Sequence, residues 1–206
     1  MLRVIGYKFK RGFSLIEVII FVAIASILVL AVSSLTGNVA NVENFIKQKL
    51  QARSGIEETF QMLVSEIRSI GPASNGAYGI EAASSSSLVF FSDIDQDGIF
   101  ERVRYIISTS TVLRGVVEPS GQPMTYPTST ESVKTVIRNV IFSTSTDFFQ
   151  YFDNAYSGSG ASLPSPIDLT QIRMVRVSIK VDTNPGKTPK PTFFSETITI
   201  RNFKNN

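Results

Sequence analysis

Residues 10–32 read KRGFSLIEVIIFVAIASILVLAV, a basic cluster followed by a continuous apolar run. The twenty residues 13–32 are about as many as a helix needs to cross a bilayer. Glu17 carries the only formal charge within this run. Because a carboxylate in hydrocarbon costs on the order of 2.5 kcal/mol or more, we expect a partner that compensates for its charge.

The positive charge of the chain is concentrated at its N-terminus. Arg3, Lys8, Lys10 and Arg11 lie in the first twelve residues without an acid, and the other 194 residues carry 16 basic and 17 acidic side chains. The net charge of +3 therefore indicates no nucleic-acid surface on the body of the protein. By the positive-inside rule, we expect the N-terminus in the cytoplasm and the segment after the apolar run outside the cytoplasmic (inner) membrane.

The composition excludes several kinds of functional site. The chain contains no cysteine and no histidine. Disulfides, thiolate or imidazole metal sites, and every Ser-His or Cys-His catalytic arrangement are therefore excluded. We expect a protein that is not an enzyme.

Three interpretations of the apolar run are open. It is a plain signal anchor, or a secretory signal peptide cut after the Ala23-Ile24-Ala25 pattern, or a helix released by a cut between Gly12 and Phe13. The signal peptide fits less well, because apolar residues continue through 27–32, where a cleavage region should turn polar. A glycine before the cut bond would let a protease approach the backbone closely.

The octapeptide KRGFSLIE at residues 10–17 resembles the class III leader of type IV pilins and type II secretion pseudopilins. The resemblance implies that a prepilin peptidase cuts after Gly12 and methylates the new amine of Phe13, which leaves a chain of 194 residues. It also implies a role in assembly for Glu17. Its carboxylate would pair with the Phe13 amine of a neighbouring subunit, so that both charges leave the apolar phase together.

Helical periodicity continues beyond the apolar run. Apolar residues recur at spacings of three and four up to Ile70, and no proline occurs before Pro72. We therefore predict one helix over about 14–70, with four segments in the whole chain. These are a cytoplasmic leader at 1–12, a transmembrane or filament-core helix at 13–35, an amphipathic helix at 36–71 and a β-rich head at 72–206.

Short β-rich runs separated by Gly, Ser, Thr, Asn and Pro follow Pro72. Within the run at 172–181, Val175, Val177 and Ile179 alternate with more polar residues, which indicates antiparallel strands with one buried face. We predict a loop at 156–166, a turn at 184–191, and an α+β, pilin-like fold in which the long helix packs on an antiparallel sheet. Strands are expected at 87–91, 99–108, 111–117, 132–143, 172–181 and 195–203. This layout is similar to the J-type minor pseudopilins and minor pilins.

The segment SDIDQDGIFERV carries a cluster of acids: Asp93, Asp95, Asp97 and Glu101. Three aspartates at alternate positions followed by Gly98 match the first half of a calcium-binding EF-hand loop. The match then fails, because the twelfth position is Arg104 and the flanking segments are predicted strands. Two interpretations stay open: a polar hairpin turn, or a calcium-binding loop in which a cation neutralises the carboxylates.

The predicted function is that of a structural subunit of a type IV pilus or pseudopilus, with a minor or tip-priming role. Its expected partners are prepilin peptidase, other pilin subunits, an inner-membrane assembly platform and membrane lipid. One alternative is a calcium-dependent binding module or adhesin on a pilin-type anchor. A membrane-anchored enzyme is a weaker alternative. No cofactor is expected apart from calcium, which the acidic segment would bind.

Overall fold

The computed structural model describes residues 12–141, 147–182 and 191–203. The chain divides into two compact units, residues 1–51 and residues 52–206. The boundary between them lies within the segment expected as an amphipathic helix. The turn predicted at 184–191 falls almost wholly outside the described residues.

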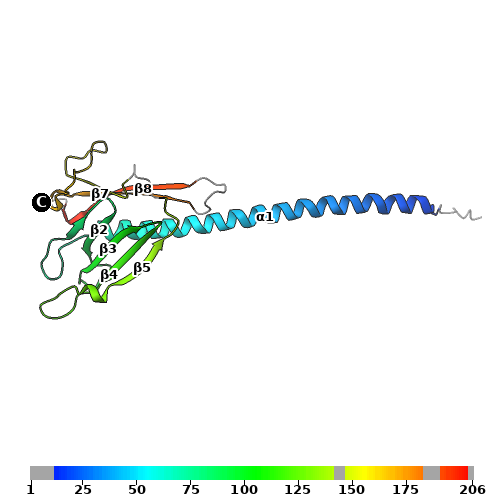
Figure 1. The fold of residues 1–206 in the computed structure, drawn as a ribbon. Coiled ribbons are helices and arrows are strands. Elements are labelled where there is room, and N and C mark those ends of the chain that lie inside the picture. Colours follow the sequence, from blue (N-terminus) through cyan, green and yellow to red (C-terminus); the bar gives the residue numbers. More distant parts are fainter. Residues whose placement is uncertain (1–11, 142–146, 183–190, 204–206) are drawn as a thin grey trace, which may run out of the picture. The chain divides into compact units, whose positions relative to one another are not determined.

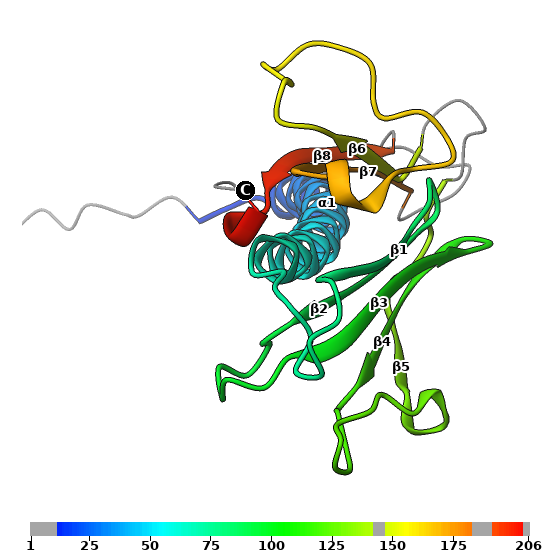
Figure 2. The same ribbon diagram turned by 90° about the vertical axis from the view of Figure 1, so that its left-hand side faces the viewer.

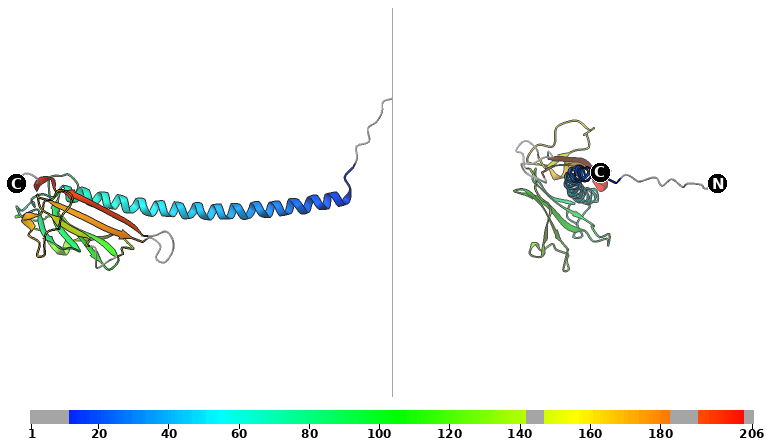
Figure 3. Two further views of the ribbon diagram at one scale, coloured as in Figure 1. Left: turned by 90° about the horizontal axis from the view of Figure 1, so that it is seen from above. Right: turned by 90° about the vertical axis from the view of Figure 1, so that its right-hand side faces the viewer.

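One helix, α1, extends over Leu15–Arg68 and contains 54 residues (Figure 1, Figure 3). It begins after Ser14, whose hydroxyl and carbonyl oxygens both accept hydrogen bonds from the backbone N–H of Glu17. It ends before Gly71, whose N–H donates to the carbonyl of Phe91 instead of continuing the helical ladder. These bounds agree with the helix predicted over about 14–70.

Among the described residues of the second unit, eight strands form two antiparallel sheets. The larger sheet has five strands in chain order, each paired with the next, and the smaller sheet has the order β6-β7-β8. The strands are β1 (Ile80–Ala83), β2 (Ser87–Ser92), β3 (Glu101–Ser108), β4 (Thr111–Val117), β5 (Ser132–Ile137), β6 (Phe149–Phe152), β7 (Met174–Val181) and β8 (Thr192–Thr199). Three short 3-10 helices, η1 (Thr128–Thr130), η2 (Leu169–Gln171) and η3 (Arg201–Phe203), lie between or after them.

The core of the second unit joins the last turns of α1 to both sheets. Leu63, Val64 and Ile67 of α1 are buried. Phe60 of α1 packs against Phe194 of β8, with ring centroids 6.1 Å apart. Figure 2 shows this end of α1 with the β1–β5 sheet on one side and the β6–β8 sheet on the other. The predicted α+β, pilin-like fold is confirmed, but its strands divide between two sheets.

Burial follows the predicted alternation along β7. Val175, Val177, Ile179 and Val181 are at most 2 % exposed. The same period appears in β3, where buried residues alternate with half-buried ones. The segment 156–166 contains no helix or strand, as predicted.

Several predicted strands have different ends in the structure. The strand predicted at 132–143 ends at Ile137, because Asn139 adopts a left-handed backbone conformation (φ 59°) that breaks the extended chain. Val140 then bridges to Val181 of the other sheet. The strand predicted to end at residue 203 stops at Thr199 and is followed by η3. Strands β1 and β6 were not predicted, since each has only four residues.

Candidate functional site

The N-terminal half of α1 presents a continuous apolar surface. The helix contains one segment, Leu15–Ser33, that is long and apolar enough to cross a membrane. The large apolar side chains between Phe13 and Val32 are 51–81 % exposed. This exposure distinguishes the segment from the core helix of a globular domain, whose apolar face is buried.

Gly12 and Phe13 lie just before this helix and Glu17 lies in its first turn, and all three are exposed. Phe13 is 81 % exposed, and a Cβ atom placed on Gly12 would meet no atom within 4 Å. The bond between Gly12 and Phe13 therefore precedes the first helical turn and is sterically open on the glycine side. Residues 1–11 lie outside the described part of the chain.

The structure adds Ser14 to the residues of this segment. Its Oγ atom accepts a hydrogen bond of 3.3 Å from the backbone N–H of Glu17. Serine at the cap and glutamate three residues later form the Ser-x-x-Glu pattern that starts many helices. The pattern is visible in the sequence, and the structure shows its Ser14 half, the bond from the backbone N–H of Glu17.

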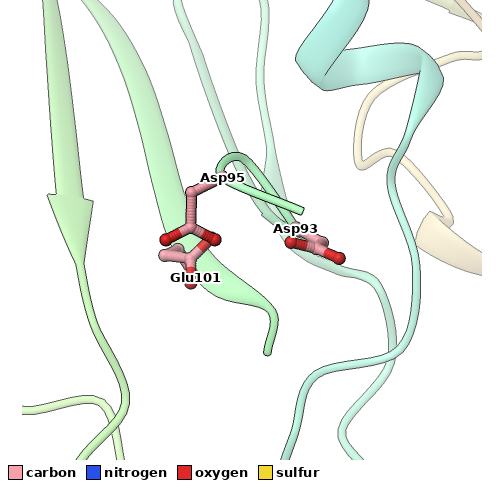
Figure 4. A group of neighbouring side chains, drawn as sticks. All are labelled: Asp93, Asp95 and Glu101. Atoms are coloured by element: carbon pink, nitrogen blue, oxygen red, sulfur yellow. The ribbon is translucent and has the colours of Figure 1, made fainter. Parts of the chain in front are cut away.

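The second candidate is the acidic loop, which we define as residues 93–101. It connects β2 to β3 and ends on Glu101, the first residue of β3. One carboxylate oxygen from each of Asp93, Asp95 and Glu101 lies within 4.8 Å of the other two (Figure 4). Asp97 is not in this group, and its Oδ1 atom accepts a hydrogen bond of 2.7 Å from the N–H of Ile99. The structure thus brings together three of the four predicted ligands.

Hydrogen bonds within the acidic loop also form a tight turn. Gly98 has φ +88°, and its N–H donates to Asp93 Oδ2 at 3.1 Å. The N–H of Asp97 donates to Asp95 Oδ1 at 3.3 Å. The acidic loop therefore has both the hydrogen bonds of a tight turn and a cluster of carboxylates. Its geometry is compatible with a polar hairpin turn and with a calcium-binding loop.

Burial in the acidic loop is unusual for carboxylates. Glu101 is only 4 % exposed, and its Oε2 atom accepts a hydrogen bond of 3.0 Å from the N–H of Ile94. Burial raises the pKa of Glu101, and the charges of Asp95 and Asp97 act in the same direction. Asp93 Oδ1 is buried and has no hydrogen-bond partner among the described residues.

A buried polar network in the head was not predicted from the sequence. Arg114 of β4 donates two hydrogen bonds to Glu66 of α1, at 2.5 and 3.1 Å, and the Tyr105 hydroxyl of β3 donates a third at 2.6 Å. Burial raises the pKa of the Tyr105 phenol, which stays protonated as a donor. One feature of the sequence could have indicated this network. Glu66 is an acidic residue on the apolar face of the helix, between Leu63 and Ile67.

Comparison with known protein families gives a match at the N-terminal segment. Residues 7–33 match the family described as the prokaryotic N-terminal methylation motif. The matched range contains the bond after Gly12, Phe13, Glu17 and the apolar segment of α1. No curated protein matches the chain.

Proposed function

We propose that this chain, whose residues 7–33 form the leader of type IV pilins and pseudopilins, is a structural subunit of a type IV pilus or a type II secretion pseudopilus. The observation that carries the proposal is the matched leader, followed directly by an exposed apolar helix. Such a leader implies processing by prepilin peptidase and assembly with other pilins. It also implies a structural role, since the work of such a subunit is packing and recognition.

Processing would remove residues 1–12 and methylate the amine of Phe13. The proposal is supported by the position of the bond, which lies outside α1 and follows a residue without a side chain. The basic residues before the bond favour a cytoplasmic N-terminus and a head on the outer side of the inner membrane. Leu15–Ser33 would then contact lipid until the subunit enters the filament.

Assembly would bury the apolar surface of α1 against the same helix of other subunits. A helix that is apolar on all sides is stable only inside a membrane or a bundle. Glu17 would pair with the methylated Phe13 amine of a neighbouring subunit, which neutralises two charges within that bundle. An inner-membrane assembly platform would supply the site where the subunit passes from lipid to filament.

We further propose that the subunit is a minor, tip-priming one of the J-type. The support is the large head, whose described residues form eight strands in two sheets, and the absence of proline from the outer part of the apolar helix, at residues 32–34. A head of this size offers surface for contacts with other minor subunits or with a secreted substrate.

Mass spectrometry of the N-terminus tests the processing step. The chain is expressed with and without a prepilin peptidase and purified from the membrane. We expect a start at N-methylated Phe13 with the peptidase, and an uncut leader without it. In the Gly12→Leu variant the bulky side chain should block the cut. A start at Ser26 in the wild type would instead identify a signal peptide and would refute the proposal.

A further inference from the structure

The turn that follows α1 contains a reactive pair of residues. Residues 73–77 read ASNGA, and Asn75-Gly76 is the only asparagine–glycine pair in the sequence. We propose that Asn75 is a site of spontaneous deamidation, at which the side-chain amide is lost and aspartate or isoaspartate remains. Both residues of the pair are exposed, so water and base reach them without any change in the fold.

The reaction joins the side chain of Asn75 to the backbone of the next residue. The Gly76 nitrogen gives up its proton to hydroxide or a buffer base and forms a bond to Asn75 Cγ. The bond between Cγ and Nδ2 then breaks, and Nδ2 takes up a proton from the conjugate acid of that base and leaves as ammonia. Water opens the resulting succinimide ring at either of its two carbonyls. Opening at one carbonyl gives aspartate, and opening at the other gives isoaspartate.

Glycine leaves the attacking nitrogen accessible. A Cβ atom placed on Gly76 would meet no atom within 4 Å, so no neighbour shields this side of the turn. Because glycine has no side chain, its nitrogen can approach the Asn75 side chain closely. Gly76 also has φ +85°, a conformation that residues with a side chain rarely adopt. The turn itself therefore favours glycine at the position that makes Asn75 reactive.

A backbone hydrogen bond holds the side-chain carbonyl of Asn75 in place. The N–H of Ala77 donates to Asn75 Oδ1 at 3.1 Å. This bond folds the side chain back toward the C-terminal side of its own backbone, where the Gly76 nitrogen lies. When that nitrogen attacks Cγ, negative charge develops on Oδ1, and an N–H that is already in place stabilises this charge. The turn thus supplies a donor of the kind found in acyl-transfer sites.

Two other hydrogen bonds of the turn oppose the reaction. The N–H of Gly76 donates to the Ala73 carbonyl at 2.8 Å, and this bond must open before the nitrogen can attack. The N–H of Ala73 donates to the Ala77 carbonyl at 3.0 Å and closes the same turn. Opening one or two such bonds lowers the population of the reactive form by a factor of about 5–30. The fold therefore slows the reaction at Asn75 without preventing it.

Deamidation would alter the connection between α1 and the larger sheet. Isoaspartate adds one carbon atom to the backbone between residues 75 and 76, so the spacing that the turn bonds require is lost. The preceding residue, Ser74, has two partners from distant segments. Its Oγ atom accepts from the N–H of Phe100 at 2.8 Å, and its N–H donates to the Tyr126 hydroxyl at 3.0 Å. A change in the turn would therefore reach the segments that precede β3 and follow β4.

Peptide mapping by mass spectrometry tests the site. The full chain, purified in an uncharged detergent, is incubated at neutral and at mildly alkaline pH and then digested. We expect the peptide that contains Asn75 to gain the mass of one deamidation and to separate into aspartate and isoaspartate forms. Its rate of formation should rise at least about tenfold between pH 6 and pH 8, because the attacking nitrogen must lose its proton.

Asn154 is the matched control within the same molecule. Like Asn75, it is exposed and lies in a turn, but the residue after it is Ala155. In both turns the N–H that would attack already donates a hydrogen bond. Deamidation at Asn154 should be at least about tenfold slower, because the alanine side chain hinders the attack. In Asn75→Gln, whose longer side chain is less well oriented for ring closure, the rate at this position should also fall at least about tenfold.

A synthetic peptide of residues 70–80 gives the rate without the fold. The folded chain should react no more than about thirtyfold more slowly than this peptide, which is the cost of opening the turn bonds. A larger difference would overturn the proposal, because the turn would then protect the amide. A rate at Asn75 no higher than that at Asn154 would overturn it as well. Circular dichroism checks that Asn75→Gln folds, and if it does not, the comparison with Asn154 decides.

Discussion

Three glutamates show how the same side chain is accommodated in different surroundings. Glu17 lies at the start of an apolar helix, where its N–H is capped by Ser14 and its charge is exposed. Glu66 is buried and receives hydrogen bonds from Arg114 and Tyr105. Glu101 is buried, and its Oε2 atom accepts a hydrogen bond from the N–H of Ile94. The two buried carboxylates therefore accept hydrogen bonds from neighbouring groups, whereas the carboxylate of Glu17 is exposed.

Removal of the Glu66 carboxylate should strongly destabilise the head. In Glu66→Ala, the largely buried Arg114 guanidinium and the Tyr105 hydroxyl lose their common acceptor. We expect the free energy of unfolding, measured by denaturant titration in detergent, to fall by about 3 kcal/mol. Tyr105→Phe removes one hydrogen bond only and should cost about 1 kcal/mol.

The control for this prediction is Glu57→Ala. Glu57 is exposed on the same helix, so its loss should change the free energy of unfolding by less than about 0.5 kcal/mol. If Glu66→Ala costs no more than this control, the network does not contribute to stability as inferred from its geometry.

At the scale of elements, the end of α1 is joined to the first strands by a close backbone crossing. The N–H of Gly71 donates to the Phe91 carbonyl, and the N–H of Phe91 donates to the Gly79 carbonyl. A Cβ atom on Gly79 would lie 2.7 Å from the Gly71 carbonyl oxygen and 3.0 Å from the Phe203 ring. Glycine is needed here because two backbone segments and an aromatic ring meet at one point.

Two glycine-to-alanine substitutions should have opposite effects on stability. Gly79→Ala forces a backbone shift at the crossing and should lower the free energy of unfolding by about 2 kcal/mol. Gly55 lies within α1, and a Cβ atom there would meet no atom within 4 Å. Gly55→Ala should raise the free energy of unfolding by about 0.5–1 kcal/mol through helix propensity. Equal effects in the same thermal denaturation assay would argue against the crossing as the critical contact.

At the scale of the whole molecule, the chain combines a membrane-length helix with a β-rich head. The apolar surface of Leu15–Ser33 is exposed in the isolated chain, so its burial requires lipid or other subunits. The head folds around its own core. Assembly and folding therefore use different parts of the sequence, and substitutions in one part should leave the other unaffected.

Replacement of Glu17 should impair filament assembly without preventing membrane insertion or cleavage. Glu17→Gln removes the charge, and glutamine still suits the third position of the capping pattern. We expect the amount of subunit in sheared filaments, measured by immunoblotting, to fall at least about tenfold because the proposed charge pair is lost. Ser14→Ala weakens the cap but keeps the charge, and it should reduce incorporation less than about threefold. Normal incorporation of Glu17→Gln would contradict the pairing.

Local features of the sequence were sufficient for a large part of this structure. The apolar run and the three- and four-residue spacing predicted α1 to within two residues at its C-terminal end. The alternation in β7 predicted the burial of Val175, Val177, Ile179 and Val181, although Ser178 on the polar face is buried as well. The helix pattern repeats every 3.6 residues and the strand pattern every 2 residues. Each pattern can therefore be recognised from the sequence of its own segment. The same holds for the leader, whose residues are contiguous.

Other features depend on contacts between distant segments, and only the tertiary structure decided them. The division of the strands into two sheets places β5 and β7 in different sheets, and four-residue strands such as β1 and β6 are too short to show a period. The Glu66–Arg114 pair joins residues 48 apart. Spacing placed four acids in one loop, but only Asp93, Asp95 and Glu101 have oxygens within 4.8 Å of one another in the part of the chain that the structure describes. Which strands pair with one another, and where each carboxylate lies, depend on packing between segments that are distant in the sequence. A pattern within one segment cannot predict such packing.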